Sequence, residues 1–385
     1  MWRAVASNGF TLLIVAAFLL AGLILWGKSE YTAEGPLEAA ICVRVPSGAN
    51  MTRVSDNLQD QGAVRSAAIM RIGADYTDKS DELKAGAFLV PERSSVEEIV
   101  DIVTRGGAST CGTEILYRIG VNSADVVVRE LDPATSRFVE KAKFVPQEDT
   151  AAPEEFTRVR DLADTRYRVT MAEGVTSWQV VDALSRIDVL DGDVAERPAE
   201  GSLAPDSYEV AEGDSRQSVI DRMRDAQSER LREAWVNRAP DLPISSPEEA
   251  LILASIIEKE TGVPEERGQV ASVFTNRLRE GMRLQTDPTV IYGITNGEGV
   301  LGRGLRRSEL DRETPYNTYV IAGLPPTPIA NPGRASIAAA VNPGDSDFLF
   351  FVADGSGGHA FARTLEEHNS NVAQWRKIEA ERANQ

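Results

Sequence analysis

A chain of 385 residues is long enough for two or three domains with cores of their own, and its shares of apolar residues, 42%, and charged residues, 26%, are ordinary for a globular protein. Its formal net charge of −18 at pH 7 argues against a surface that binds nucleic acid or an anionic membrane. With two histidines, two cysteines, no CxxC and no HExxH, the sequence predicts neither a dedicated zinc site nor an iron–sulfur cluster. It also lacks a phosphate-binding P-loop and a strand-associated GxGxxG. We therefore expect no metal and no cofactor, and carboxylate chemistry is the natural candidate.

The first part of the chain is a nearly unbroken apolar run from Phe10 to Trp26. The run reaches the lower end of the length that crosses a bilayer as a helix, it exceeds the usual core of a signal peptide, and no A-x-A cleavage pattern follows it. We predict an uncleaved transmembrane anchor over residues 1–30 rather than a cleaved signal peptide. The small N-terminal tail and the large acidic body favour a short cytoplasmic tail and an exported body.

The two cysteines, Cys42 and Cys111, flank one compact segment. In an oxidising compartment they could close this segment with a disulfide, whereas two isolated buried thiols would behave as small hydrophobic side chains. The sequence does not supply the Cα separation that a disulfide needs. Both alternatives therefore stay open.

Two stretches of the chain share a pattern of strand, helix, extended segment and helix. The first runs from Cys42 to Gly106, and the second begins with the strand-like YRVTM and continues through GSLAPDSYEV to QSVIDRMRDA. We interpret them as a duplicated small α/β unit, with a chance similarity of two α/β patches as the alternative. An insertion that contains the strand-like VVVREL separates them. The main domain boundary is placed in the linker 238–244, where the composition changes from acidic and amphipathic to apolar.

A helix that is apolar on almost every side is predicted for LILASIIEKET, residues 251–261. Ser246 can supply its N-cap, and Pro247 occupies the first helical position, where a missing N–H costs nothing. The helix ends by carrying Glu258 and Glu260 inward. Because burial disfavours the charged form of a carboxyl group, a glutamate on such a helix is normally paired or used as an acid.

Further helices and a group of amide side chains follow. We predict a helix over residues 263–279 and a short one within LQTDPTVIYG, residues 284–293, which Asp287 can cap. Asn276 and Gln285 have no comparable structural reason for their positions. Planar amides suit the recognition of sugar hydroxyls and N-acetyl groups, so both are candidates for substrate contact.

A proline-dense segment, GLPPTPIANPG at residues 323–333, is interpreted as a rigid extended wall of a groove for a linear polymer, although a plain connector would have the same composition. After a helix around residues 337–341, FLFFVAD and GGHAFA are typical of a β-hairpin, and a final helix covers residues 365–382. We therefore expect an α+β protein whose C-terminal part is mainly helical with one β-hairpin.

Five blocks of this C-terminal part carry a family signature: LASIIEKET, VFTNRLREGMRLQTDPTVIYG, TPYNTY, GLPPTPIANPG and FFVADGSGGHAF. In that order they resemble the YceG-like endolytic murein transglycosylases, the MltG family. The N-terminal helix and the segment VPSG…LKAGAFLVP also fit that family, in which a LysM-like region precedes the catalytic domain. The resemblance implies a LysM-like unit at 31–118, an insertion and a second LysM-like unit at 119–240, and a catalytic transglycosylase domain at 241–385. The insertion departs from the family pattern.

The activity that the resemblance implies is that of a lytic transglycosylase. Such an enzyme cleaves the β-1,4 bond between N-acetylmuramic acid (MurNAc) and N-acetylglucosamine (GlcNAc) without water and leaves a 1,6-anhydromuramoyl end, and here it would terminate nascent glycan strands. The implied partners are peptidoglycan glycan strands, the lipid bilayer through the N-terminal helix, and peptidoglycan synthases. The implied location is a single pass through the inner membrane with the catalytic domain in the periplasm.

The implied reaction needs one carboxyl group with two successive roles. Because the C6 hydroxyl of the substrate attacks, one glutamate can first protonate the leaving oxygen and then accept the hydroxyl proton. This role requires a raised pKa, which an apolar helix would provide by burial.

Glu258 and Glu260 lie about 200° apart around a helix, so they cannot both point into one cleft. Ala254 and Ser255 leave room for a sugar one turn below Glu258, and we therefore predict Glu258 as the acid/base, with Glu260 exposed or paired with an arginine such as Arg277 or Arg283.

Supporting residues are assigned by family resemblance and by polarity. We predict that Asn276, Gln285, Tyr316 and Asn317 line the glycan groove, although each can equally be a buried structural hydrogen bonder. Tyr292 can stack on a sugar face or belong to the core. A lone histidine is more often structural, so His359 is left outside the catalytic set.

Two functions from other classes remain alternatives. One is a hydrolase of the lysozyme type, with Asp287 as the second carboxylate. The other is a membrane-anchored glycan-binding scaffold without catalysis. The product end distinguishes the hydrolase from the transglycosylase, and a wild-type protein without activity on glycan would favour the scaffold.

Overall fold

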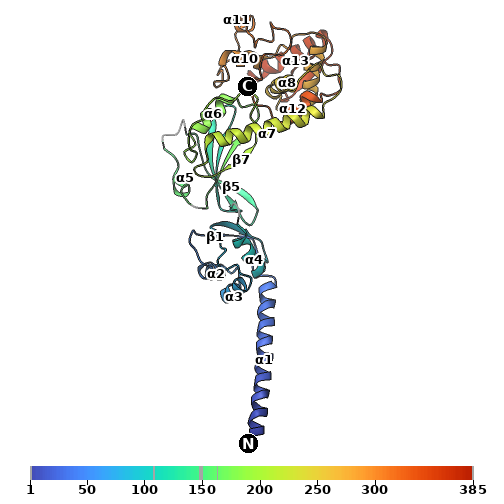
Figure 1. Cartoon of the computed structure of the whole chain (residues 1–385). Coiled ribbons are helices and arrows are strands. Elements are labelled where there is room, and N and C mark those ends of the chain that lie inside the picture. Colours follow the sequence, from blue (N-terminus) through green and yellow to red (C-terminus); the bar gives the residue numbers. More distant parts are fainter. Residues whose placement is uncertain (1, 107–108, 147–150, 163, 384–385) are drawn as a thin grey trace. The chain divides into compact units, whose positions relative to one another are not determined.

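Figure 1 shows the computed structural model of the chain, which describes residues 2–106, 109–146, 151–162 and 164–383. Helices and strands are mixed, as the α+β prediction requires. The chain forms two compact units. Unit 1 comprises Met1–Ile115, Val127–Phe144 and Ala151–Tyr167, and unit 2 comprises Leu116–Val126, Val145–Thr150 and Arg168–Gln385. The predicted boundaries at 31, 119 and 241 differ from this division and stay a prediction.

The chain begins with one long helix, α1 (Trp2–Thr32). Within the described residues, its segment Thr11–Thr32 is the stretch that is long and apolar enough to cross a membrane, and no residue of its most apolar part is buried. Near its end, Tyr31 is buried against α3, where a Cβ on Gly73 would lie only 2.1 Å from the tyrosine ring. The predicted apolar helix is therefore confirmed, and it continues directly into a packed domain.

The first small domain of unit 1 is built from capped helices on a two-stranded sheet. Its elements are β1 (Ile41–Val45), α2 (Met51–Asp60), α3 (Ala67–Tyr76), β2 (Gly86–Val90) and α4 (Val96–Thr104). The strands are antiparallel, with Val43 opposite Phe88. Ser95 and Glu98 form a capping box at the start of α4. The apolar faces of these elements meet in one buried cluster that includes Val43, Leu58, Met70 and Ile99.

A disulfide joins Cys42 and Cys111, whose Cα atoms are 5.9 Å apart. This separation is in the usual range for a disulfide, and both residues lie in a small apolar cluster with Ala87 and Leu131. Of the two alternatives that the sequence left open, the structure therefore has the disulfide.

The predicted insertion and the second α/β stretch form a five-stranded sheet of order β5-β4-β3-β6-β7. The strands are β3 (Thr113–Ile119), β4 (Ala124–Asp132), β5 (Arg137–Phe144), β6 (Arg166–Met171) and β7 (Ser207–Val210). The helices of this region are α5 (Glu154–Val159), α6 (Ser177–Ser185) and α7 (Arg216–Val236). The strand-like VVVREL and YRVTM lie in β4 and β6, which confirms both strands.

The element order β1-α2-α3-β2-α4 recurs in part as β6-α6-β7-α7, with one helix fewer. The two stretches differ in their sheets, because β1 and β2 form a sheet by themselves whereas β6 and β7 extend a larger one. The order of elements is compatible with a duplication. The duplication and the LysM-like character of both stretches stay predictions.

The C-terminal part of unit 2 is helical with one hairpin, as predicted. Its elements are α8 (Pro247–Glu260), α9 (Arg267–Arg279), α10 (Asp287–Thr295), α11 (Arg307–Leu310), α12 (Arg334–Val341), β8 (Phe350–Ala353), β9 (His359–Ala362) and α13 (Leu365–Ala383). The hairpin is antiparallel, with Phe351 opposite Phe361. Helix α8 lies in the middle of the core, where Leu253, Ile256 and Ile257 are fully buried.

Candidate active site

Local sequence signals position both ends of α8. The Ser246 hydroxyl accepts a hydrogen bond from the Glu249 N–H at 3.2 Å, and Pro247 stands in the first turn, which confirms the predicted start. The helix ends at Glu260, with Thr261 as its C-cap. Helix α9 begins only at Arg267, four residues later than predicted, because the intervening residues form a turn.

The last three side chains of α8 point to different neighbours. The Gly333 N–H donates to Glu258 at 2.9 Å, and the Thr286 hydroxyl donates to Glu260. Between them, the Lys259 ammonium donates to the Gly174 carbonyl at 3.4 Å. The helix therefore gives each of its two glutamates a separate environment, as the 200° separation predicts.

The environment of Glu260 favours a protonated carboxyl group. Although part of the residue reaches the surface, burial of its carboxyl raises the pKa, and the negative charge of Asp287 raises it further. The hydrogen bond from Thr286 and the positive charges of His359 and Arg277 act in the opposite direction. Burial is the largest of these effects, so Glu260 has the raised pKa that a general acid needs.

Arg277 acts on Glu260 through its charge, without the ion pair that the sequence offered as one possibility. Its guanidinium donates to the carbonyls of Leu349 and Leu284, at 2.7 and 2.6 Å. Arg283 donates to the Tyr319 carbonyl at 3.1 Å. Within the described part of the chain, the direct partner of the Glu260 carboxyl is thus a neutral hydroxyl.

The second acidic neighbourhood surrounds Gly333, the N-cap of α12. Glu258 accepts the Gly333 N–H, and Glu173 packs so closely that a Cβ on Gly333 would lie 1.7 Å from its carboxylate oxygen. Burial raises the pKa of Glu173, and the charge of Glu258 raises it further, while Arg267 and Arg230 lower it. Glu258 therefore helps to hold the start of α12.

The structure does not contain the room for a sugar that the sequence predicted beside Ala254 and Ser255. Ala254 and Ser255 are fully buried, and the Ser255 hydroxyl accepts the Ile329 N–H at 3.0 Å. The proline-rich segment, residues 323–333, therefore covers these small residues and fills the room that was expected for a sugar. The small side chains of Ala254 and Ser255 thus serve the packing of α8 within the core.

Two of the predicted substrate residues use their amides within the protein. Asn276 donates to the carbonyls of Ser346 and Phe348 at 2.8 and 3.0 Å. Asn317 is fully buried and donates to the Arg312 carbonyl at 2.7 Å. Both amides hold loops of unit 2, and their contact with a substrate stays a prediction.

Of the other two predicted substrate residues, Gln285 is exposed and Tyr316 is half-buried. Gln285 is exposed, with a positive φ of 52°, and its side-chain amide makes no hydrogen bond to another described residue. Tyr316 shares a hydrogen bond of 2.8 Å with the Thr327 hydroxyl, and its ring centre lies 5.0 Å from that of Tyr292. Tyr292 is half-buried, so its exposure does not decide between stacking on a sugar and a place in the core.

The expectation that Asp287 caps α10 is wrong. Thr286 is the N-cap, and Asp287 is the first helical residue. Its carboxylate accepts the Tyr319 hydroxyl at 2.7 Å instead. Because Thr286 donates its hydroxyl to Glu260, the start of α10 holds the two carboxyl groups near each other.

His359 belongs to a carboxylate–histidine pair that the sequence did not predict. Its Nδ1 lies 2.8 Å from Glu266, and the same carboxylate accepts the His359 N–H at 2.9 Å. The neighbours of the two glutamates that the sequence did not predict are Thr286 and Glu173. Thr286 lies in the block LQTDPTVIYG, which could have pointed to it, whereas Glu173 reaches Glu258 only through folding.

Unit 2 contains a cleft of about 340 Å³ next to the end of α8. Its walls come from the start of α6, from α10 and from the glycine-rich loop 297–303, and Lys259 and Tyr292 line it. The volume is in the range of ordinary ligand sites. This cleft, at the same end of α8 as the two glutamates, is therefore the candidate for substrate binding.

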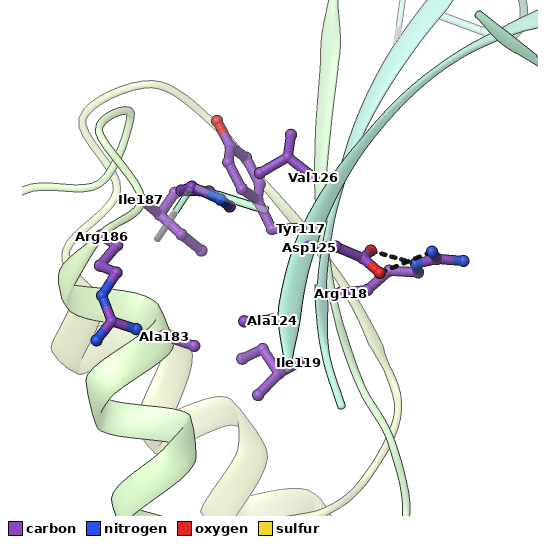
Figure 2. Close-up of a pocket in the computed structure, with 10 residues that line it drawn as sticks. Tyr117, Arg118, Ile119, Ala124, Asp125, Val126, Ala183, Arg186 and Ile187 are labelled. Atoms are coloured by element: carbon purple, nitrogen blue, oxygen red, sulfur yellow. Dashed lines mark hydrogen bonds and ion pairs between the residues drawn. The ribbon is translucent and has the colours of Figure 1, made fainter. Parts of the chain in front are cut away.

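A second cavity, between α6 and the sheet, has a volume of only about 30 Å³. Figure 2 shows Ala183 and Ile187 facing Ile119, with the ion pair of Arg118 and Asp125, at 2.6 Å, on the other side of the strands. Such a volume holds roughly one or two water molecules. The cavity is too small for a sugar.

Comparison with known proteins gives one consistent result. The family profile described as YceG-like family matches residues 43–374. A protein of Bacillus subtilis (strain 168) named endolytic murein transglycosylase is 27% identical over 353 residues, which cover 91% of this chain and 89% of that protein. A protein of the same name from Streptococcus pneumoniae (strain D39) is 28% identical, over 87% of this chain and 58% of its own length.

Among solved structures, a YceG-like protein of Listeria monocytogenes is similar, with 25% identity and a TM-score of 0.45, covering 86% of this chain and 99% of that chain. The family match extends from the first small domain into the last helix. This chain belongs to the YceG-like family.

Proposed function

We propose that the protein is a membrane-anchored endolytic lytic transglycosylase of peptidoglycan. It cleaves the β-1,4 bond between MurNAc and GlcNAc, leaves a 1,6-anhydroMurNAc end and so terminates nascent glycan strands. Two relatives that match about nine tenths of the chain are named endolytic murein transglycosylases. The observation that carries the proposal is Glu260, whose carboxyl has a pKa raised by burial at the end of the central helix.

The proposed mechanism uses Glu260 twice. Its protonated carboxyl gives a proton to the glycosidic oxygen as the bond to C1 of MurNAc breaks, and GlcNAc leaves with a free hydroxyl. The C6 hydroxyl of the same MurNAc attacks C1, and the Glu260 carboxylate accepts the proton that this hydroxyl loses. Protons and electrons balance, and the carboxyl returns to its protonated form.

Between the two glutamates, burial of its carboxyl favours Glu260 as the acid. Glu258 was the prediction from the sequence, but the room that supported it is occupied by the proline-rich segment, and its carboxylate receives the Gly333 N–H. This hydrogen bond to the start of α12 suits a positioning residue. We keep Glu258 as the second candidate for the acid.

For the substrate groove we propose direct contact with sugar through Gln285 and Tyr316. Gln285 offers a free, exposed amide just before Thr286, and Tyr316 belongs to a pair of aromatic rings. Asn276 and Asn317 would then act by fixing loops rather than by binding sugar.

For the location we propose that α1 is an uncleaved single-pass anchor in the inner membrane and that the body lies in the periplasm. The support is its length and apolar composition, and the disulfide is compatible with an oxidising compartment. A position beside nascent glycan makes peptidoglycan synthases the proposed protein partners.

The test compares Glu260→Gln and Glu258→Gln, two isosteric changes on the same helix. Purified wild type is expected to convert glycan strands to fragments with anhydro ends, seen by mass spectrometry. Glu260→Gln should lower the rate by about 10²- to 10⁴-fold, whereas Glu258→Gln should retain most of it. The reverse pattern would move the acid to Glu258, and full activity of both variants would overturn the single-glutamate mechanism.

A hydrolase of the lysozyme type is the second candidate function, and the proximity of Asp287 to Glu260 favours it. In that case the product would carry a reducing end instead of an anhydro end. The same mass measurement distinguishes the two, because the products differ by one water. A folded wild type without any activity would favour the binding scaffold.

A further inference from the structure

The cleft next to α8 is lined by cations and by no carboxylate. Among its lining residues, Lys259 and Arg303 are the charged ones. Arg303 is already paired with Glu309, through contacts of 2.6 and 2.9 Å. In a chain with a net charge of −18, a cleft lined in this way indicates an anionic ligand.

Lys259 has an ammonium group that the protein satisfies poorly. Its contact with the Gly174 carbonyl is long, at 3.4 Å, and it forms no ion pair within the described residues. Burial lowers the pKa of Lys259, while the charges of Glu258 and Glu200 raise it from a distance. A half-buried ammonium with free donors is stabilised by an anion that enters the cleft.

The uncharged walls of the cleft suit a sugar or its substituents. Ile291, Tyr292 and Ile329 provide apolar and aromatic surface. The Thr176 hydroxyl is used within the wall, where it donates to the Gly297 carbonyl at 2.6 Å. Because Arg303 is paired with Glu309, the Lys259 ammonium is the charged group of the cleft lining that is left for a ligand.

The position of Lys259 connects this cleft with the proposed acid. Lys259 precedes Glu260 in α8, and Pro288, which also lines the cleft, follows the Thr286–Asp287 pair in α10. A polymer whose scissile bond lies at Glu260 would thus place a neighbouring substituent in the cleft.

We propose that this cleft binds a carboxylate of the peptide stem on the glycan strand, with Lys259 as the cation that recognises it. The inference rests on the proposed function, because it assumes that the substrate is peptidoglycan. Peptide stems end in carboxylates, whereas the sugar hydroxyls and N-acetyl groups of the strand are neutral. Lys259 would therefore make the enzyme prefer strands whose stems carry free carboxylates over strands whose stem carboxylates are amidated.

The test measures a preference rather than an activity. The kcat/KM of the full chain is determined on glycan strands whose peptide stems carry free carboxylates and on the same strands after amidation of these carboxylates. Wild type is expected to prefer the strands with free carboxylates by about tenfold, and Lys259→Met should bring this ratio close to one, mainly through KM. Lys259→Arg should keep most of the preference, because it keeps the charge.

Two controls separate the outcomes. Lys377→Met removes an exposed lysine of α13 and should leave the ratio unchanged.

A binding experiment needs no turnover. Calorimetry measures how an N-acetylmuramoyl peptide binds to the Glu260→Gln protein. The affinity should weaken about tenfold when Lys259→Met is added or when the peptide carboxylate is amidated. Equal losses on both kinds of strand, or binding that ignores the amidation, would overturn the proposal. A wild type that cleaves neither strand yet binds the peptide through Lys259 would contradict the proposed function alone.

Discussion

At the scale of single residues, the two glutamates of α8 show how much the surroundings decide. They are two positions apart on one helix, but Glu260 accepts a hydrogen bond from a side-chain hydroxyl and Glu258 accepts one from a backbone N–H. For Glu260, burial of the carboxyl raises the pKa and so favours the protonated form. The chemistry therefore follows from what other segments bring to the helix end.

The hydroxyl of Thr286 gives a direct test of this view. It stabilises the charged form of Glu260, so Thr286→Val should raise the pKa of Glu260 still further. The protonated acid then persists to higher pH, and the alkaline limb of the kcat/KM profile should move to higher pH. Thr289→Val, which removes a hydroxyl of the same helix that donates to the Thr286 carbonyl, is the matched control and should leave this limb in place.

The sequence predicted the divergence of the glutamates correctly but could not predict which groups surround each of them. Helical geometry is local, so the 200° separation follows from the sequence alone. The covering of Ser255 by Ile329 and the contact of Thr286 with Glu260 join segments far apart in the chain. No periodicity within α8 contains that information.

At the scale of elements, the proline-rich segment is a packed part of the core. Asn331 is fully buried, donates to the Val175 carbonyl at 2.9 Å and accepts the Leu203 N–H at 2.9 Å. It therefore joins the segment to the region after β6 and to the loop before β7. The composition predicted rigidity, but the partners of the segment depend on the tertiary fold.

Asn331→Ala should destabilise unit 2 because it leaves a buried N–H without its partner and weakens the hold on a buried carbonyl. We expect a loss of about 3 kcal/mol in the free energy of unfolding, measured with urea. Asn342→Ala removes an exposed amide at the end of α12 and should cost less than about 0.5 kcal/mol. Equal effects of the two changes would show that Asn331 does not fix the segment.

At the scale of the whole molecule, the order of parts was predictable and the pairing of strands was not. The apolar first helix, the first α/β stretch and the helical C-terminal part all carry local patterns. The order β5-β4-β3-β6-β7 brings the predicted insertion and the second α/β stretch into one sheet, which no local pattern indicates. The predicted linker 238–244 is likewise tied to α12, because the Ala239 N–H donates to the Val341 carbonyl at 2.9 Å.

The disulfide supplies a test at this scale. It closes a loop between residues 69 positions apart, so its reduction should destabilise unit 1 by about 4 kcal/mol in the chain-entropy view. Urea unfolding with and without reductant should show the shift, and a double variant with Cys42→Ser and Cys111→Ser should no longer respond to reductant. An unchanged wild-type transition would mean that the bond contributes nothing to stability.

The packing of Tyr31 on Gly73 also has a mechanical consequence. Because the end of α1 is wedged into the first small domain, there is no flexible spacer between the apolar helix and the body that follows it. For the proposed membrane anchor, such a rigid joint would restrict the height and tilt of the first small domain above the bilayer. Less orientational freedom would then be lost when a substrate near the membrane is bound, so the effective concentration of that substrate would rise.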